Sequence, residues 1–353
     1  VTDKSMCVNG VFYGLNTIDT PILFASVVGP AFRNKDCNYY LYMLDGTGLI
    51  TAYSSQDTKY VLLVPTNEQI ESEDIYLRTY ADGSRLQQET EDGLVDVSSS
   101  VMRTIVNIHT ATGVDGLKTN GTQVLATQTG FNYWYVKDGK ITSSAAYNQI
   151  LEPDNNVEPF SEFTEVKNGN DNWNNGRTYM YSGTALFQAQ EGDGLQHKLS
   201  VCNDNRYVYY QFAQLLQKAG MVMSSNYIFG LAGASHVIGF IPTNEAIITA
   251  IAAGQIPGMD VTGAVTSSLQ LRQYLLSYFI RDRENALISY PYPGSAMKSS
   301  TYVTASGKSL AYTDSGSSLS IMVDGKVANV ISDYNLFPFA FDDGCFQLID
   351  AVL

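Results

Sequence analysis

The sequence contains one short pattern twice: an apolar run followed by Pro-Thr-Asn-Glu. The apolar runs occupy residues 61–64 and 238–241, and the tetrapeptides follow at 65–68 and 242–245. A short apolar run that ends at a proline predicts a buried strand, because proline has no amide hydrogen to donate to a sheet. After the second tetrapeptide, Ile247, Ile248 and Ile251 continue at helical spacing. The pattern therefore predicts a strand, a turn and a helix at both places.

Each residue of the tetrapeptide has a structural role in such a turn. The proline ends the strand, the threonine or the asparagine caps the following helix, and the glutamate favours the positive end of the helix dipole. The residues in these roles are Pro65, Thr66, Asn67, Glu68, Pro242, Thr243, Asn244 and Glu245. No acid or histidine is placed by sequence to pair with either glutamate, so the pattern favours a scaffold over a general base.

Three further landmarks follow both tetrapeptides in the same order. Residues 101–109 and 271–279 carry apolar side chains at helical spacing. Asp-Gly pairs at 138–139 and 324–325 lie between alternating apolar residues, which predicts two-residue hairpins because both turn residues need positive φ. Turn dipeptides then precede a closing strand, at Asn175-Gly176 and Asp343-Gly344. The chain is therefore predicted to hold two copies of one unit.

The repeat also predicts the domain limits. We expect a first domain over residues 19–189, a short exposed linker over 190–197 and a second domain over 198–353. Asn9-Gly10 precedes another apolar segment, so residues 1–18 are expected to be the closing strand of a further domain upstream of this chain. An isolated strand leaves its backbone groups unpaired, so this one is expected to pair with the first domain or with a partner chain.

The complete pattern resembles fasciclin-like domains. The resemblance rests on GFIPTNEAI (residues 239–247), on GCFQLIDAVL (residues 344–353) and on the helix and hairpin between them. It implies an α+β fold of two tandem fasciclin-like domains, each a small β-sandwich or wedge packed with helices. It also implies adhesion to, or recognition of, a protein or polysaccharide at a cell surface, without catalysis. In the family these motif positions, which here include His109 and Asp350, are mainly structural.

The sequence departs from the family pattern at one functional position. A Tyr-His dipeptide, linked to integrin binding in animal members, reads Ile108-His109 in the first unit and Tyr278-Phe279 in the second. Because neither unit has the dipeptide, the resemblance does not imply that partner.

Charge and composition narrow the possible partners. The 353 residues carry a net charge of -14, which disfavours nucleic acid and anionic membranes, and no apolar run reaches the roughly 18 residues of a membrane span. Tyr, Gly and Asn are abundant and only 16% of residues are charged. We therefore expect an exported protein of a cell surface or bacterial outer envelope, anchored as a lipoprotein through residues upstream of Val1. Cys7, Cys37, Cys202 and Cys345 form no C-x-x-C pair, so free, buried thiols are expected.

No catalytic or metal-binding motif is complete. Ser295 and Lys298 fit S-x-x-K, but neither S-D-N nor K-T-G follows. Asp314-Ser315-Gly316 is typical of a turn, since no histidine motif accompanies it. Residues 168–176 are rich in asparagine but lack the alternating acids of an EF-hand. The sequence thus predicts no enzyme activity, cofactor or metal ion.

One group of aromatic residues is a candidate binding surface. Tyr133 and Tyr135 share one face of a predicted strand and Trp134 takes the other, while Trp173 lies near the end of the same unit. These rings either pack in the core or present one face to a sugar or a protein. The alternative function is therefore a carbohydrate-binding protein of a bacterial envelope.

Overall fold

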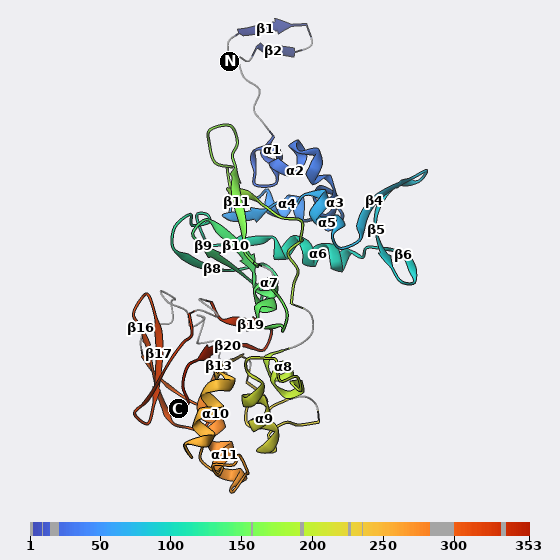
Figure 1. Ribbon diagram of the computed structural model, residues 1–353. Coiled ribbons are helices and arrows are strands. Elements are labelled where there is room, and N and C mark those ends of the chain that lie inside the picture. Colours follow the sequence, from blue (N-terminus) through green and yellow to red (C-terminus); the bar gives the residue numbers. More distant parts are fainter. Residues whose placement is uncertain are drawn as a thin grey trace. The chain divides into compact units, whose positions relative to one another are not determined.

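The computed structural model describes residues 3–8, 10–14, 21–156, 158–190, 194–224, 227–234, 236–282, 300–332 and 337–353. Contacts within the chain divide it into two compact units, the first of residues 1–116 and 163–186 and the second of residues 117–162 and 187–353. Both combine helices with β-sheet, which makes the protein an α+β protein (Figure 1).

The first unit has a central sheet with the strand order β7-β3-β12-β11. These strands are β7 (Thr110–Thr112), β3 (Tyr60–Leu63), β12 (Gly176–Tyr181) and β11 (Ser161–Val166), the last of which enters the unit at Phe163. The helices are α1 (Ile22–Ala25), α2 (Gly29–Arg33), η1 (Lys35–Cys37), α3 (Asn38–Gly46), α4 (Leu49–Tyr53), α5 (Asn67–Glu71) and α6 (Ser99–Ile108). A second sheet, β4 (Ile75–Tyr80), β5 (Gly83–Thr90) and β6 (Gly93–Asp96), lies between α5 and α6 in the chain.

The second unit has a central sheet with the strand order β14-β13-β20-β19. These strands are β14 (Phe279–Asp282), β13 (His236–Pro242), β20 (Gly344–Ile349) and β19 (Phe339–Phe341). A four-stranded sheet is formed by β15 (Ser300–Val303), β16 (Ser309–Asp314), β17 (Leu319–Val323) and β18 (Lys326–Asn329). Strands β8 (Thr122–Ala126), β9 (Tyr133–Lys137) and β10 (Lys140–Ser143) pair in chain order. The helices are α7 (Ser144–Asn148), η2 (Gln149–Leu151), α8 (Leu195–Val201), α9 (Tyr210–Lys218), α10 (Asn244–Ala252), α11 (Ser268–Leu275) and η3 (Leu276–Tyr278).

The two central sheets repeat one topology. In each, the strand before the tetrapeptide (β3 or β13) pairs in parallel with the closing strand (β12 or β20) and antiparallel with the strand after the longer helix (β7 or β14). The repeat of strands and helices predicted from the sequence is therefore confirmed in the geometry of the sheets.

The closing strand approaches its parallel neighbour at a glycine in both units. A Cβ atom on Gly176 would lie 1.9 Å from the Tyr60 carbonyl oxygen, and one on Gly344 would lie 2.1 Å from the Val237 carbonyl oxygen. The residue before each glycine then binds a backbone amide 148 residues earlier in the chain. Asn175 Oδ1 accepts a hydrogen bond from the Val27 amide at 2.9 Å, and Asp343 Oδ1 accepts one from the Leu195 amide at 2.5 Å.

The tetrapeptides form the predicted turns, but the asparagines act differently from the prediction. Thr66 and Thr243 are the N-caps, accepting from the amides of Gln69 and Ala246, and Gln69 completes a capping box with Thr66. Asn67 and Asn244 instead begin their helices. The expectation that either asparagine could cap its own helix is wrong, because the threonine already occupies that position.

Each asparagine binds the start of an earlier helix, α3 for Asn67 and α9 for Asn244. Asn67 Oδ1 accepts from the Tyr39 amide at 3.1 Å, and its Nδ2 donates to the Lys35 carbonyl at 3.3 Å. Asn244 Oδ1 accepts from the Gln211 amide at 2.8 Å, and its Nδ2 donates to the Tyr207 carbonyl at 2.8 Å. The spacing between the two bonded backbone groups is the same in both units. The asparagine thus satisfies, from outside, an amide that the first turn of a helix leaves without a partner.

Both Asp-Gly hairpins are confirmed. Asp138 and Gly139 have φ of 48° and 79° between β9 and β10, and Asp324 and Gly325 have φ of 51° and 81° between β17 and β18. Asp314-Ser315-Gly316 is also a turn, since the Asp314 carboxylate accepts from the Gly316 amide at 2.7 Å. Ile247 is buried and Ile251 half-buried as expected, but Ile248 is exposed.

Contacts divide the chain differently from the predicted domain limits. Residues 117–162, expected in the first domain, lie in the second unit because Tyr135, Tyr147 and Leu151 belong to its hydrophobic core. Residues 195–197 of the predicted linker 190–197 form the first turn of α8, and Leu195 is buried. The limits at residues 19 and 189 remain predictions.

The first strand pairs with its own chain. Strand β2 (Gly10–Gly14) is antiparallel to β1 (Asp3–Cys7), so one edge of β2 is paired within this segment. The expected contact of the segment with the first domain or with a partner chain remains a prediction. Residues 1, 2, 9 and 15–20 lie outside the described residues. The further upstream domain remains a prediction.

Three cysteines are free and buried as expected: Cys37, Cys202 and Cys345. Burial raises the pKa of the Cys37 and Cys202 thiols to about 11. Within the described parts of the chain, no helix combines the length and the apolar character needed to cross a membrane.

The asparagine contacts predict a matched effect in both units. Asn67→Ala and Asn244→Ala should each lower the free energy of unfolding by about 1 kcal/mol, because each removes an N-terminal helix bond. Chemical denaturation measures the change. Asn205→Ala, at an exposed turn position, is the control and should leave stability unchanged. Equal stability of all three variants and the parent would contradict the role assigned to Asn67 and Asn244.

The closing strands predict a larger effect. Gly176→Ala and Gly344→Ala should each destabilise the protein by about 3 kcal/mol or more, because the new Cβ would overlap a backbone carbonyl that cannot rotate away. Gly130→Ala is the control, since a Cβ there meets no atom within 4 Å and φ is not positive. Thermal unfolding followed by circular dichroism tests the difference, and similar midpoints for Gly130→Ala and Gly344→Ala would be inconsistent with it.

Candidate functional site

Three of the four candidate aromatic residues are core residues. Trp134 and Tyr135 are fully buried, Trp173 is 3% exposed, and Tyr133 is half-buried. The Tyr135 hydroxyl donates to the Pro338 carbonyl at 2.8 Å, and Trp173 Nε1 donates to the Val166 carbonyl at 2.6 Å. The interpretation of these rings as a ligand-binding face is therefore wrong for Trp134, Tyr135 and Trp173. Both faces of β9 are covered, and Trp173 packs in the core of the first unit.

His109 is a buried, neutral core residue. Its Nδ1 lies 2.7 Å from the Ile105 carbonyl oxygen and its Nε2 lies 3.0 Å from the Tyr181 hydroxyl. A carbonyl only accepts, so Nδ1 carries the proton and Nε2 accepts from Tyr181. Burial lowers the pKa of His109 to about 4. The ring thus joins α6 to the closing strand β12.

Asp350 and Tyr278 fix the end of the second unit. The Asp350 carboxylate accepts from the Asn329 amide at 2.7 Å and from Asn329 Nδ2 at 3.0 Å. The Tyr278 hydroxyl accepts from the Leu353 amide at 2.8 Å. The structural role that the family resemblance implies for Asp350 agrees with these contacts.

The other sequence candidates do not assemble a catalytic site among the described residues. Glu68 and Glu245 are exposed in the first turns of α5 and α10. The S-x-x-K segment with Ser295 and Lys298 lies outside the described residues. Across the described ranges, no group of three or more His, Cys, Asp or Glu side chains is arranged to hold a metal ion.

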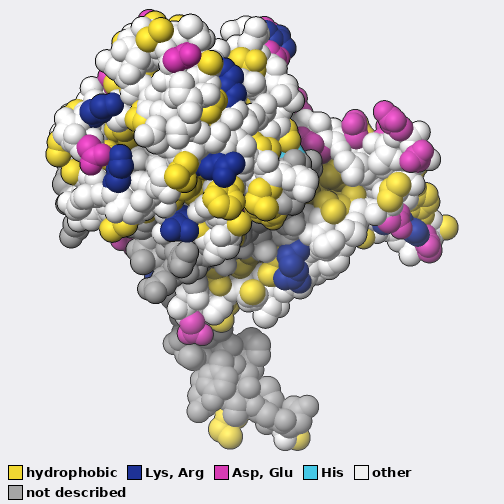
Figure 2. Space-filling view, turned by 90° about the horizontal axis from the view of Figure 1, so that it is seen from below, with side chains coloured by type: hydrophobic (Ala, Val, Ile, Leu, Met, Phe, Trp, Pro, Cys, Tyr) yellow, Lys and Arg dark blue, Asp and Glu magenta, His cyan; other side chains and the backbone are white. Residues whose placement is uncertain are grey.

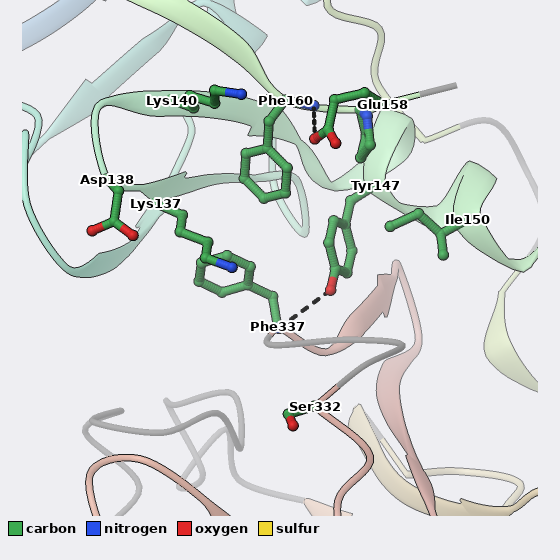
Figure 3. A pocket seen from close by; sticks show the side chains of 10 residues that line it. Lys137, Asp138, Lys140, Tyr147, Ile150, Glu158, Phe160, Ser332 and Phe337 are labelled. Carbon is green, nitrogen blue, oxygen red and sulfur yellow. Dashed lines mark hydrogen bonds between the residues drawn. The ribbon is translucent and has the colours of Figure 1, made fainter. Parts of the chain in front are cut away.

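A pocket of about 440 Å³ opens in the second unit (Figure 3). Three aromatic rings line it, from Tyr147 on α7, Phe160 before β11 and Phe337 before β19. Lys137 and Lys140 line it from the end of the β9–β10 hairpin. The pocket thus combines an aromatic wall with two cations.

The aromatic wall is held by a stacked cluster. The Phe337 ring lies 4.7 Å from the Tyr135 ring at an interplanar angle of 3°, and the Tyr147 ring meets Tyr135 edge-on at 5.2 Å. The Tyr147 hydroxyl accepts from the Phe337 amide at 3.4 Å (Figure 3). Tyr147 and Phe337 are buried, whereas Phe160 is half-buried and reachable from the pocket. Tyr135, buried behind the pocket, thus supports its wall.

The residues of the pocket come from four stretches of the chain, near residues 137–140, 147–150 and 158–160 and at Ser332 and Phe337. Only the Asp-Gly turn at 138–139 was singled out by its sequence pattern, and the two lysines flank that turn directly. On the surface in Figure 2, acidic and basic side chains are interspersed with apolar ones. The local charge at one site can therefore be positive although the net charge of the protein is -14.

Comparison with known proteins gives structural similarity without a match in sequence families. No family model matches the chain, and no curated protein matches it. Among solved structures, the chain is similar to a FAS1 domain pair from the insect cell adhesion molecule fasciclin I. The TM-score is 0.34 and the sequence identity 12%, over 91% of this chain and 97% of that chain.

The state of His109 predicts a pH dependence of stability. The pKa of His109 in the folded protein is about 4, below the usual histidine value of 6.5, so the unfolded state takes up the proton first as pH falls. The stability that the neutral, buried His109 contributes to the fold is complete above pH 6.5 and is lost as the pH falls toward 4. Between pH 7.5 and 5.0 the loss should be about 2 kcal/mol.

Urea denaturation at a series of pH values measures this loss. His109→Gln should be less stable at pH 7.5 but should show a flatter dependence on pH, because the titrating group is gone. The matched control His197→Gln should keep the parental slope. The same slope in His109→Gln and the parent would argue against a buried neutral His109.

Proposed function

We propose that this protein is a non-enzymatic cell-surface adhesion or recognition protein built from fasciclin-like domains. It is exported and held at a cell surface or outer envelope. The observation that carries the proposal is the repeated scaffold, in which the tetrapeptide side chains bind their own unit. Asn67 and Asn244 support this most directly, since both side-chain atoms of each amide group are used in helix contacts.

The glutamates of the tetrapeptides support the same proposal. A catalytic carboxylate usually lies in a cleft beside a second acid, a base or a nucleophile. Glu68 and Glu245 are exposed on helix first turns, where a negative charge stabilises the helix. Glu245 lines a pocket with Asp350, but the Asp350 carboxylate is bound by the Asn329 amide and side chain. The duplicated motif is better explained by folding than by chemistry.

The pocket favours a second candidate, a carbohydrate-binding protein of a bacterial envelope. Aromatic walls with a few polar groups are typical of small-ligand sites, and pockets for such ligands span about 300–1,000 Å³. The pocket of about 440 Å³ beside Phe160 falls in this range. This candidate refines the first, because a surface polysaccharide can be the adhesion partner.

A glycan array and a cell-adhesion assay with the purified protein separate these functions. We expect saturable binding to cells or to surface polysaccharide, with no turnover of ester, peptide or glycoside substrates. Binding to cells that survives removal of their glycans would favour a protein partner. Turnover that is lost in Ser295→Ala would overturn the proposed non-enzymatic role.

A further inference from the structure

We propose that the pocket at Lys137, Lys140 and Phe160 binds a uronic acid residue of a saccharide, with the lysines holding the carboxylate and the aromatic wall facing the sugar ring (Figure 3). This inference rests on the proposed recognition function and names the ligand class of one site.

The two lysines form an electrostatically unfavourable pair in the absence of an anion. Lys137 and Lys140 are register partners on adjacent antiparallel strands, so their side chains leave the same face of the hairpin. Like charges that are directly opposite in this way destabilise a sheet. Both lysines are exposed, and among the described residues neither forms an ion pair within 4.0 Å. Glu162 on β11 is the register partner of Lys140 on its other side, so one carboxylate lies beside the two ammonium groups and offsets part of their repulsion. A bound carboxylate would relieve the repulsion.

The two acids that line the pocket are engaged elsewhere. Asp138 Oδ1 accepts from the Gly121 amide at 2.7 Å, and in Figure 3 its carboxylate points away from the pocket. Glu158 Oε1 accepts from the Phe160 amide at 3.3 Å. The acids thus hold backbone groups in place and leave the two ammonium groups available to a ligand.

The wall opposite the lysines suits the apolar face of a sugar ring. Phe160 is half-buried, with its ring 6.0 Å from Tyr147 and 6.1 Å from Phe337. Ile150 and Pro159 extend the apolar surface beside it. Rings held by such packing lose little entropy when a ligand stacks on them. An amphipathic ligand with a ring and one negative group matches this arrangement.

The overall negative charge does not prevent this binding. Charges separated by more than a Debye length, about 8 Å at physiological ionic strength, are largely screened. A small ligand in the pocket therefore responds mainly to Lys137 and Lys140. A long polyanion also extends over the acidic surface around the pocket. It should therefore gain less binding free energy per negative charge than a short ligand does.

Calorimetry with digalacturonate and its dimethyl ester tests the proposal. The ester keeps the rings but removes the charges. We expect the acid to bind at least tenfold more tightly than the ester, and its affinity to fall as salt is raised. Lys137→Ala/Lys140→Ala should lose at least tenfold in affinity for the acid and little for the ester. Lys35→Ala/Lys167→Ala removes two exposed lysines of the first unit and is the matched control, with unchanged affinity.

A second variant tests the aromatic wall. Phe160→Ala should lower the affinity for the acid and for the ester by the same factor, because the substitution removes ring contacts and no charge. Equal affinity for acid and ester in the parent, unchanged affinity in Lys137→Ala/Lys140→Ala, or no binding of digalacturonate would each overturn the site. The comparison of acid with ester uses the parent protein alone, so it decides the question even if a variant does not fold.

These outcomes also separate the site from the proposed function. Failure of digalacturonate binding together with retained binding to cells or polysaccharide would reject the site and leave the recognition function standing. Absence of binding in every assay would reject both.

Discussion

The closing strand of each unit approaches a buried parallel strand so closely that only glycine fits. Gly176 and Gly344 allow this approach to β3 and β13, and the other contacts of each unit's core depend on the register it sets. The preceding side chain, Asn175 or Asp343, then binds a backbone amide 148 residues earlier in the chain. One glycine and one acceptor therefore connect the closing strand of each unit to a segment far away in the sequence. Burial of the Asp343 carboxyl raises its pKa.

Short-range features were predictable from the sequence because their causes are local. An Asp-Gly pair needs positive φ whatever surrounds it, and a threonine before a helix caps it with its own side chain. The hairpins at Gly139 and Gly325 and the helix starts that follow Pro65 and Pro242 could be predicted from such rules. The repeat could be found for the same reason, since each landmark has a local signature and only their order had to be compared.

Long-range contacts were not predictable in this way. The sequence places Asn67 beside Thr66 but does not show which of them caps the helix, because the partner of Asn67 is a backbone amide on α3. Alternation on β9 predicts one exposed face, yet Trp134 and Tyr135 on opposite faces are both buried. The membership of residues 117–162 in the second unit likewise depends on where Tyr135 and Tyr147 pack, which no local pattern specifies.

The pocket illustrates a difference between a repeated scaffold and a site. Both hairpins keep the Asp-Gly turn, but Lys137 and Lys140 flank the first, whereas Val323 and Lys326 flank the second. Lys326 donates to the Leu353 backbone oxygen at 3.2 Å and is thereby used in the fold. The repulsive lysine pair and its aromatic wall therefore occur at only one of these two hairpins. The Asp-Gly turn shared by both hairpins belongs to the repeated scaffold, whereas the lysine pair is specific to the first hairpin and is the part of it that we assign to ligand binding.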